Sequence, residues 1–151
     1  MIKTGDKIPY FNLKDNHGKL VSSEDFKGKK LLLSFHPLAW TGVCAKQMQS
    51  LENNFEKFKN LNTVALGLSI DTTFTKNEWA KSLNINKTPL VSDFWPSGEL
   101  AIKLGIFRGN DGFSERANII IDENGIVIFV KIYDIPELPD INEILSFLET
   151  V

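Results

Sequence analysis

The most constraining feature of the sequence is an apolar run that leads through a short turn into a helical pattern. Residues 31–35 read Leu-Leu-Leu-Ser-Phe, which is typical of a strand covered on both faces. After the turn at 36–41, residues of one helix face recur at steps of four, three, four and three: Cys44, Met48, Leu51, Phe55 and Phe58. Such spacing predicts a single amphipathic helix that extends to about residue 60. The chain is therefore expected to carry its one cysteine at the start of a helix, directly after a central strand.

Weaker patterns on either side of this unit predict further elements. Residues 10–14 and 19–22 flank the turn cluster Asp15–Gly18, which indicates an N-terminal β-hairpin. Apolar and small residues alternate over 64–70, as expected of a strand. A helix is predicted over 72–83, capped by one of the two threonines at its start.

The second half of the chain predicts a short strand, a short helix and a hairpin. Residues 90–93 form the strand, and Ser97 is expected to cap a helix that ends at Gly105. Two apolar runs, 117–121 and 126–132, are joined by an Asn-Gly pair. That pair is the strongest hairpin signal in the sequence.

A final amphipathic helix is expected near the C-terminus. Asp140 and Glu143 resemble a capping box, and the apolar residues that follow have helical spacing: Ile141, Ile144, Leu145 and Leu148. No repeat, low-complexity tract or linker divides the chain, so residues 1–151 are expected to form one domain. The order of elements predicts the α/β class, with a mixed central sheet, an N-terminal hairpin and helices on both faces.

Composition excludes several classes of function. The formal net charge is -2 and the charged residues of both signs are interleaved, which gives no basic footprint for nucleic acid or an anionic membrane. No apolar run approaches the roughly 20 residues that span a bilayer, and the N-terminus resembles no secretory signal. One cysteine cannot form an internal disulfide, which favours a reducing compartment. We therefore expect the protein in the cytoplasm.

The turn before Cys44 is suited to activating a thiol. The thiolate is the nucleophile, and a free cysteine with a pKa near about 8.5 is mostly protonated at neutral pH. Unpaired N–H groups and the helix dipole favour an anion in the first helical turn. Thr41 is suited to cap this helix, and Pro37 and Gly42 shape the turn. The alternative, that Cys44 is only a small buried apolar residue, does not require these turn residues.

The motif Pro37-x-x-x-Thr41-x-x-Cys44 is similar to the active-site motif of the peroxiredoxins. The likeness continues in three further segments: Gly5–Gly18, Asp93–Ile106 and Ser114–Asp122. Within that family the chain most resembles the one-cysteine proteins related to alkyl hydroperoxide reductase E and the bacterioferritin-comigratory proteins. The resemblance covers nearly the whole chain and implies a thioredoxin-like fold and thiol peroxidase activity.

The resemblance also implies a role for each matching residue. Cys44 would be the thiolate that attacks the terminal peroxide oxygen. Arg116 would lie beside it and stabilise the thiolate and the charge on the leaving oxygen. The hydroxyl of Thr41 would hold the peroxide in line, and Pro37 would shield the site from water. The backbone N–H groups of Val43 and Cys44 would complete the set of donors to the substrate.

Two positions depart from the family pattern. Ala45 follows the cysteine, where serine or threonine is usual, and Gln47 stands where a glutamate that orients the arginine is common. The amide of Gln47 can accept a hydrogen bond from Arg116, although more weakly than a carboxylate. With Val43, Gln47 is expected at the substrate-binding side of the site.

The missing second cysteine determines how the catalytic cycle would close. A sulfenic acid on Cys44 has no internal thiol to meet, so an external thiol must resolve it: glutathione, a glutaredoxin-type protein or thioredoxin. A disulfide between two Cys44 residues is disfavoured if both lie in pockets. No cofactor or metal is expected, and a homodimer is expected by resemblance alone.

Alternative interpretations remain open for the function and for single residues. A monothiol disulfide oxidoreductase is the main competing function. The family of such enzymes resembles this chain less, because it carries a proline directly before the strand that faces the cysteine, where this chain has Arg116. A non-catalytic interaction or holdase module ranks last. Arg116 has the alternative interpretation of a surface residue without a catalytic role. His36 is interpreted as a packed or solvated residue rather than as a titrating member of the site. The aromatic residues near the motif are interpreted mainly as packing residues: Trp40, Phe94 and Trp95.

Overall fold

A seven-stranded mixed sheet forms the centre of the protein. The computed structural model describes residues 1–151. The order of the strands is β2-β1-β5-β4-β3-β8-β9, and their bounds are β1 (Asn12–Asp15), β2 (Leu20–Ser22), β3 (Lys30–Phe35), β4 (Thr63–Ser69), β5 (Leu90–Ser92), β8 (Arg116–Ile121) and β9 (Val127–Tyr133). Strands β3, β4 and β5 are parallel to one another, whereas β8 runs antiparallel to β3. The carboxyl ends of the three parallel strands therefore meet at one edge of the sheet.

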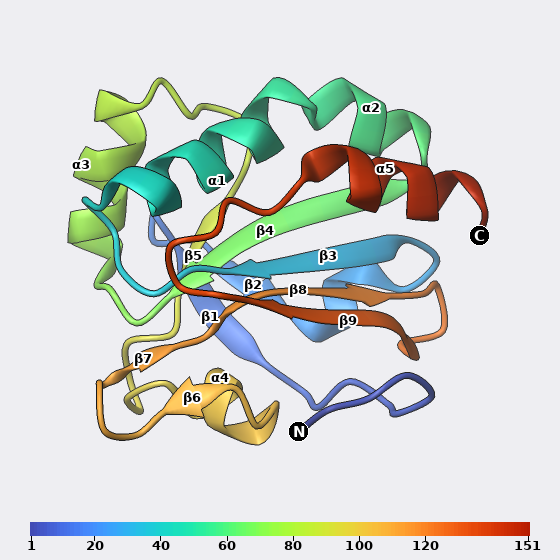
Figure 1. The fold of residues 1–151 in the computed structure, drawn as a ribbon, viewed down its shortest axis with the longest axis horizontal. Coiled ribbons are helices and arrows are strands. Elements are labelled where there is room, and N and C mark those ends of the chain that lie inside the picture. Colours follow the sequence, from blue (N-terminus) through green and yellow to red (C-terminus); the bar gives the residue numbers. More distant parts are fainter.

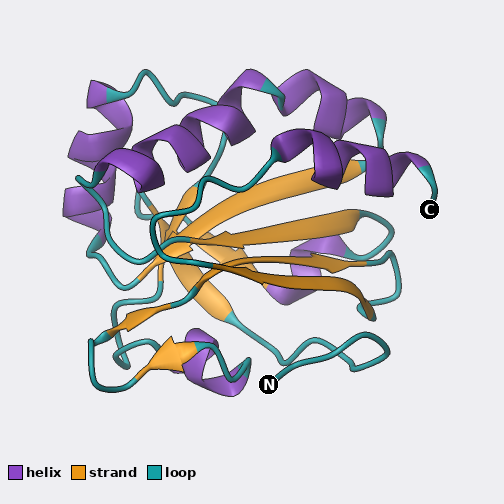
Figure 2. Ribbon diagram, in the orientation of Figure 1, coloured by secondary structure: helices purple, strands orange, loops and turns teal.

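Helices cover both faces of this sheet, as the sequence predicts (Figures 1 and 2). Their bounds are α1 (Gly42–Asn53), α2 (Phe55–Asn60), α3 (Thr73–Ser82), α4 (Glu99–Lys103) and α5 (Ile141–Glu149), with a 3-10 turn at Ser23–Phe26. Four of them, α1, α2, α3 and α5, lie above the sheet in Figure 1, and α4 lies below it beside the N-terminal segment. This is the mixed sheet of a thioredoxin-like fold.

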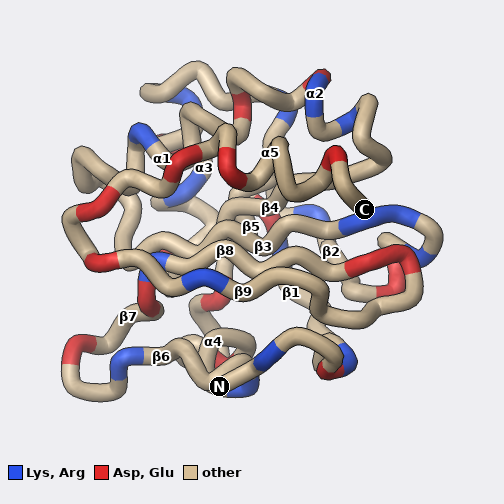
Figure 3. The backbone as a smooth tube through the Cα atoms, turned by 45° about the vertical axis from the view of Figure 1, so that its right-hand side comes forward, with Lys and Arg blue, Asp and Glu red and all other residues tan.

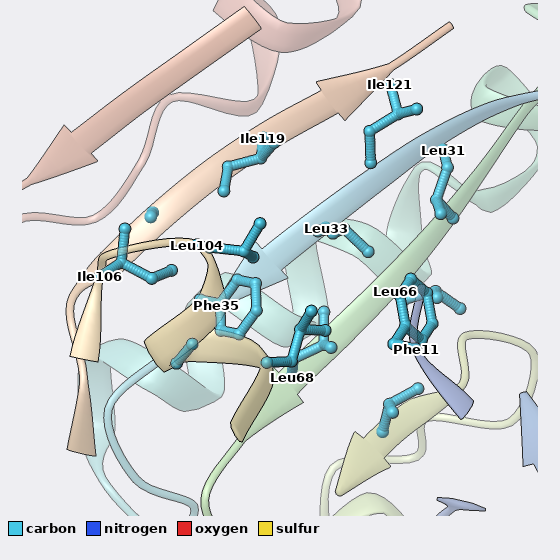
Figure 4. Packing of buried hydrophobic residues seen from close by; sticks show 14 of the residues in the cluster. Phe11, Leu31, Leu33, Phe35, Leu66, Leu68, Leu104, Ile106, Ile119 and Ile121 are labelled. Atoms are coloured by element: carbon cyan, nitrogen blue, oxygen red, sulfur yellow. The ribbon is translucent and has the colours of Figure 1, made fainter. Parts of the chain in front are cut away.

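The two faces of the sheet bury two separate apolar clusters. Strand β3 contributes to both, because alternate side chains of a strand point to opposite faces. Leu31, Leu33 and Phe35 belong to the cluster on the α4 side (Figure 4). Leu32 belongs to the cluster beneath α1, α2, α3 and α5. All six residues of β3 are buried, which is why this strand has the nearly continuous apolar sequence.

Most of the predicted elements are confirmed, including both hairpins. Residues Asn12–Asp15 pair antiparallel with Leu20–Ser22, and β8 pairs antiparallel with β9. Thr72 caps α3 by accepting from the Thr75 N–H. A two-stranded hairpin of β6 (Phe107–Arg108) and β7 (Phe113–Ser114) lies outside the main sheet and was not predicted.

Three details of the sequence-based prediction are wrong. The single helix predicted after Cys44 is interrupted at Asn54, whose backbone leaves the helical region, so α1 and α2 are separate. The short helix α4 is not capped by Ser97. Its N-cap residue is Gly98, whose backbone is in the left-handed conformation. Asp140 caps α5 as expected, but Glu143 does not complete a capping box, because its carboxylate binds Lys131.

A glycine sets how closely α1 approaches the sheet. A Cβ atom at Gly67 of β4 would overlap the Sδ atom of Met48 and lie 2.9 Å from Cδ2 of Leu90. Contacts this close do not occur between real side chains, so only glycine permits the present packing of Met48 against β4. Met48 lies one turn of α1 after Cys44 and, like Cys44, is buried.

Charged residues of both signs are scattered over the chain and form no single-sign face (Figure 3). This distribution agrees with the small net charge of -2. None of the helices combines the length and the apolar character needed to cross a lipid bilayer.

Candidate active site

Cys44 is the third residue of α1, which begins directly after the loop that follows β3. Its side chain is 1% exposed. The first N–H groups of a helix have no intrahelical acceptor; here the first intrahelical bond is donated by Ala45 to the Thr41 carbonyl. The sulfur therefore lies at the positive end of the helix dipole, where a negative charge is stabilised.

Thr41 occupies the N-cap position, as predicted, but it makes no side-chain capping bond. Its hydroxyl instead donates to the carbonyl of Leu38 over 2.9 Å. The hydroxyl hydrogen is thereby used within the loop, and the oxygen retains lone pairs that can accept a hydrogen bond. Thr41 and Gly42 are exposed, so they form the solvent side of the site above the buried sulfur.

Arg116 lies against Cys44. Although 72 positions separate the two residues in sequence, Arg116 Nη1 is 3.3 Å from Cys44 Sγ. Residue 116 is the first residue of β8, and β8 pairs with β3, which precedes the cysteine loop. Adjacent strands thus bring the cation and the thiol together. Arg116 is 2% exposed, so the alternative interpretation of a surface residue is wrong.

Two further groups fix the orientation of the guanidinium. Nε and Nη2 of Arg116 both donate to the carbonyl oxygen of Ile135, over 2.9 and 2.7 Å. Nη1 donates to Gln47 Oε1 over 2.8 Å. The planar, forked arginine side chain can satisfy all of these acceptors at once, which a lysine cannot.

Gln47 is the residue that connects α1, β3 and β8 at the site. Its Nε2 donates to Ser34 Oγ over 2.8 Å and to the carbonyl of Phe35 over 3.1 Å. Its Oε1 accepts from Arg116, so both polar atoms of the amide are engaged within the protein. Gln47 thus accepts the hydrogen bond from Arg116 that the sequence suggests, whereas its predicted place at the substrate-binding side stays a prediction. Val43, the other expected substrate contact, is half-buried beside the cysteine.

Pro37 is buried in the loop between β3 and α1. The loop is held by the Ala39 N–H, which donates to Asp71 Oδ2 over 2.8 Å. Trp40 adopts a left-handed backbone conformation with a φ of 66°, which is uncommon for a bulky residue and requires support from the surrounding structure. These contacts hold the backbone of the loop that carries Pro37 and Thr41.

A buried lysine lies behind the loop, and the sequence analysis missed it. Lys76 of α3 is fully buried and donates to Ser69 Oγ over 2.6 Å, with His36 Nε2 at 3.3 Å. A signal was present: Lys76 precedes Trp79 and Ala80 by three and four residues, so it falls on the buried face of the predicted helix. Lysines at such positions usually keep the ammonium in water, so the pattern alone did not indicate full burial.

Burial changes the protonation of both members of this pair. Loss of hydration lowers the pKa of Lys76 to about 7, an effect that the charges of Asp71, Cys44 and Asp93 oppose. Burial, followed by the charges of Lys76 and Arg116, lowers the pKa of His36 well below its usual value of 6.5. His36 is therefore a packed, neutral residue at physiological pH; its ring centroid lies 5.3 Å from that of Trp79.

The aromatic residues near the site do not pack into the core. Trp40 is 57% exposed, Phe94 48% and Trp95 76%, so the packing interpretation is wrong for all three. Trp79 is the aromatic residue buried behind the site. A cavity of about 760 Å³ at the opposite end of β3 is lined by residues such as Lys7, Phe26 and Asn124 and does not include Cys44.

Comparison with known proteins finds relatives in sequence and in fold. Alkyl hydroperoxide reductase E of Mycobacterium bovis is 33% identical over 141 residues, which cover 93% of this chain and 92% of that protein. A reduced 2-Cys peroxiredoxin of Plasmodium vivax superposes with a TM-score of 0.90 at 26% identity, covering 99% of this chain and 81% of that chain. AhpC of Enterococcus faecalis shares the fold, with a TM-score of 0.92 at 24% identity, covering 99% and 92% of the two chains. The model of the AhpC/TSA family matches residues 4–130, and the chain belongs to this family.

Proposed function

We propose that the protein is a one-cysteine thiol peroxidase that reduces hydrogen peroxide and alkyl hydroperoxides through Cys44. The observation that carries the proposal is the position of Arg116 Nη1, 3.3 Å from Cys44 Sγ, at the first turn of α1. A helix N-terminus and a buried guanidinium both favour the thiolate over the thiol. An inert core cysteine requires neither.

The chemical step is a two-electron displacement. The thiolate of Cys44 attacks the terminal oxygen of the peroxide, the S–O bond forms and the O–O bond breaks. Sulfur is oxidised to a sulfenic acid, and the peroxide is reduced to water or an alcohol after the leaving oxygen takes up a proton. Arg116 is suited to stabilise the charge that develops on this leaving oxygen, because its position is fixed before the substrate arrives.

The loop residues are proposed to hold the peroxide in line for this displacement. The Thr41 oxygen is free to accept a hydrogen bond from the peroxide, since its own hydrogen is donated to Leu38. The N–H groups of Val43 and Cys44 are suited to donate to the peroxide oxygens. Buried Pro37 would limit the access of water. In this proposal Gln47 acts through Arg116.

The oxidised cysteine is proposed to be reduced by a thiol from another molecule. The sequence contains no second cysteine, and the burial of Cys44 disfavours a direct disulfide between two copies. An external thiol would attack the sulfenic sulfur and release water, and a second thiol would then release Cys44. Glutathione, a glutaredoxin-type protein and thioredoxin are the proposed reductants. A cytoplasmic location, which supplies such thiols, and a homodimer are part of the same proposal.

Steady-state peroxide turnover with each reductant in turn tests the proposal. We expect hydrogen peroxide to be consumed with at least one of the three, and Cys44→Ser to abolish this consumption. Hydroxyethyl disulfide, tested with glutathione, serves as the control substrate. Reduction of this disulfide without any reduction of peroxide would replace the peroxidase with the disulfide oxidoreductase.

A further inference from the structure

We propose that Lys76 is a positioning residue for peroxide reduction, which holds the Pro37 loop from behind and supplies a second buried positive charge to the site. The inference rests on the proposed function. It assigns a role to the one fully buried lysine, which makes no contact with the reacting sulfur and lies outside the family motif.

Lys76 is buried without a partner carboxylate. Lys76 has no ion pair, whereas the nine ion pairs in the structure use other cations. Its Nζ instead donates to the Ser69 hydroxyl and approaches His36. Burying an ammonium group in this way is costly. An apolar residue at this position in α3 would avoid the cost, so a role for the amine outside folding explains its presence best.

Both hydrogen bonds of Lys76 lead to the active-site loop. His36, the first bonded partner, directly precedes Pro37. Ser69, the second, donates to Asp71 Oδ2 over 2.7 Å. The same carboxylate oxygen accepts from the Ala39 N–H over 2.8 Å. Lys76 is thus connected to the loop on both sides of Pro37.

Lys76 and Cys44 also interact electrostatically. The negative charge of Cys44 raises the pKa of Lys76, and interactions between two titrating sites are reciprocal. A protonated Lys76 therefore attracts the negative charge that the proposed reaction places on the sulfur of Cys44. The charged and titratable groups that face Lys76 from the elements around it are His36, Cys44, Asp71 and Asp93, while Arg116 acts on His36.

This arrangement makes the reaction sensitive to pH in a range where most enzymes work. Because burial lowers the pKa of Lys76 to about 7, the lysine loses its charge as the pH rises through neutrality. Arg116 remains charged throughout this range. The Lys76 contribution to peroxide reduction is thus present below about pH 7 and is lost above it.

The test compares single-turnover oxidation of Cys44 by hydrogen peroxide in the wild type and in Lys76→Met between about pH 5.5 and pH 9. Quenched-flow alkylation with mass spectrometry measures the thiol that remains. We expect Lys76→Met to slow the reaction about tenfold or more at low pH. We also expect the rate constant of the wild type, divided by that of Lys76→Met, to fall by about fivefold or more between pH 6 and pH 9. Lys81→Met, which removes an exposed lysine from the same helix, is the matched control and is expected to react like the wild type.

A Lys76→Met protein with the wild-type rate at every pH would overturn the proposal. If this variant does not fold, Ser69→Ala replaces it, because the change removes only the hydroxyl between Lys76 and Asp71. Ser69→Ala is expected to oxidise more slowly than the wild type, and the Lys76 contribution to its rate is still expected to decline as the pH rises through about 7. A wild-type rate in Ser69→Ala would overturn the proposal. A wild-type protein that reacts no faster than free cysteine would instead contradict the proposed function itself, and the role of Lys76 would fall with it.

Discussion

Gln47 Oε1 accepts a hydrogen bond of 2.8 Å from Arg116 Nη1. The same nitrogen lies 3.3 Å from the sulfur of Cys44. Together with the Ile135 carbonyl, this neutral amide on α1 therefore holds the guanidinium beside the thiol of the same helix. The first two predictions separate the orientation of this cation from its charge.

Gln47→Leu is expected to slow the oxidation of Cys44 and to destabilise the protein. Leucine has a similar size but leaves Arg116 Nη1 and the Phe35 carbonyl without the partners they have now. The free energy of unfolding should fall by about 1–3 kcal/mol, and the oxidation rate about tenfold. Urea unfolding and single-turnover oxidation measure the two effects. Gln49→Leu, on the same helix, is the control, and equal behaviour of the two variants would contradict the role of Gln47.

Arg116→Lys is expected to slow the reaction with peroxide about 100-fold, although it keeps a positive charge. A lysine has no fork with which to bind the Ile135 carbonyl and Gln47 together, so its charge would not stay beside the sulfur. Quenched-flow oxidation at neutral pH measures the rate. Arg108→Lys, in a more exposed arginine that pairs with Asp111 and Glu115, should react like the wild type. An unchanged rate in Arg116→Lys would show that charge alone is sufficient.

The free energy of unfolding is expected to depend on pH through the buried Lys76. Its pKa is about 7 in the folded protein, against 10.5 as the ordinary value. Between these values the unfolded chain binds more protons than the folded one, so the contribution of Lys76 to the free energy of unfolding rises with pH. Below about pH 7 both states are protonated, and the full cost of burying the ammonium remains.

Urea unfolding of the wild type and of Lys76→Met at about pH 7 and about pH 9.5 measures this contribution. The free energy of unfolding of the wild type, minus that of the variant, is expected to increase between the two pH values. Taking the difference removes the contributions of the other titrating groups. A difference that does not change with pH would show that Lys76 keeps its proton in the folded protein.

The sequence predicts the strand–loop–helix unit because its signals are local. The apolar run of β3, the turn residues and the helical spacing from Cys44 to Leu51 each reflect a burial pattern within a few residues. The same local signal failed at Asn54, since Phe55 and Phe58 continue the spacing across a break between α1 and α2. Spacing reports which side chains are buried, and it does not report whether the backbone between them remains helical.

The pairing of Arg116 with Cys44 was predicted from family resemblance and not from local pattern. It depends on the antiparallel register of β8 against β3, which spacing along the chain does not encode. The anchoring of Arg116 by the Ile135 carbonyl and the burial of Lys76 also depend on tertiary contacts. A lysine on the inward face of a helix usually extends its amine to water, whereas the amine of Lys76 contacts Ser69 at the end of β4 and His36 just after β3.

The most direct test of the account is the rate at which one equivalent of hydrogen peroxide oxidises Cys44 at pH 7. Rapid quenching with an alkylating reagent and mass spectrometry gives the rate, with free cysteine measured under the same conditions. The account predicts oxidation that is faster than that of free cysteine by orders of magnitude, a sulfenic acid as the first product, and a return to the thiol when an external thiol is added. Oxidation of Cys44 at the rate of free cysteine, in a folded protein, would contradict it.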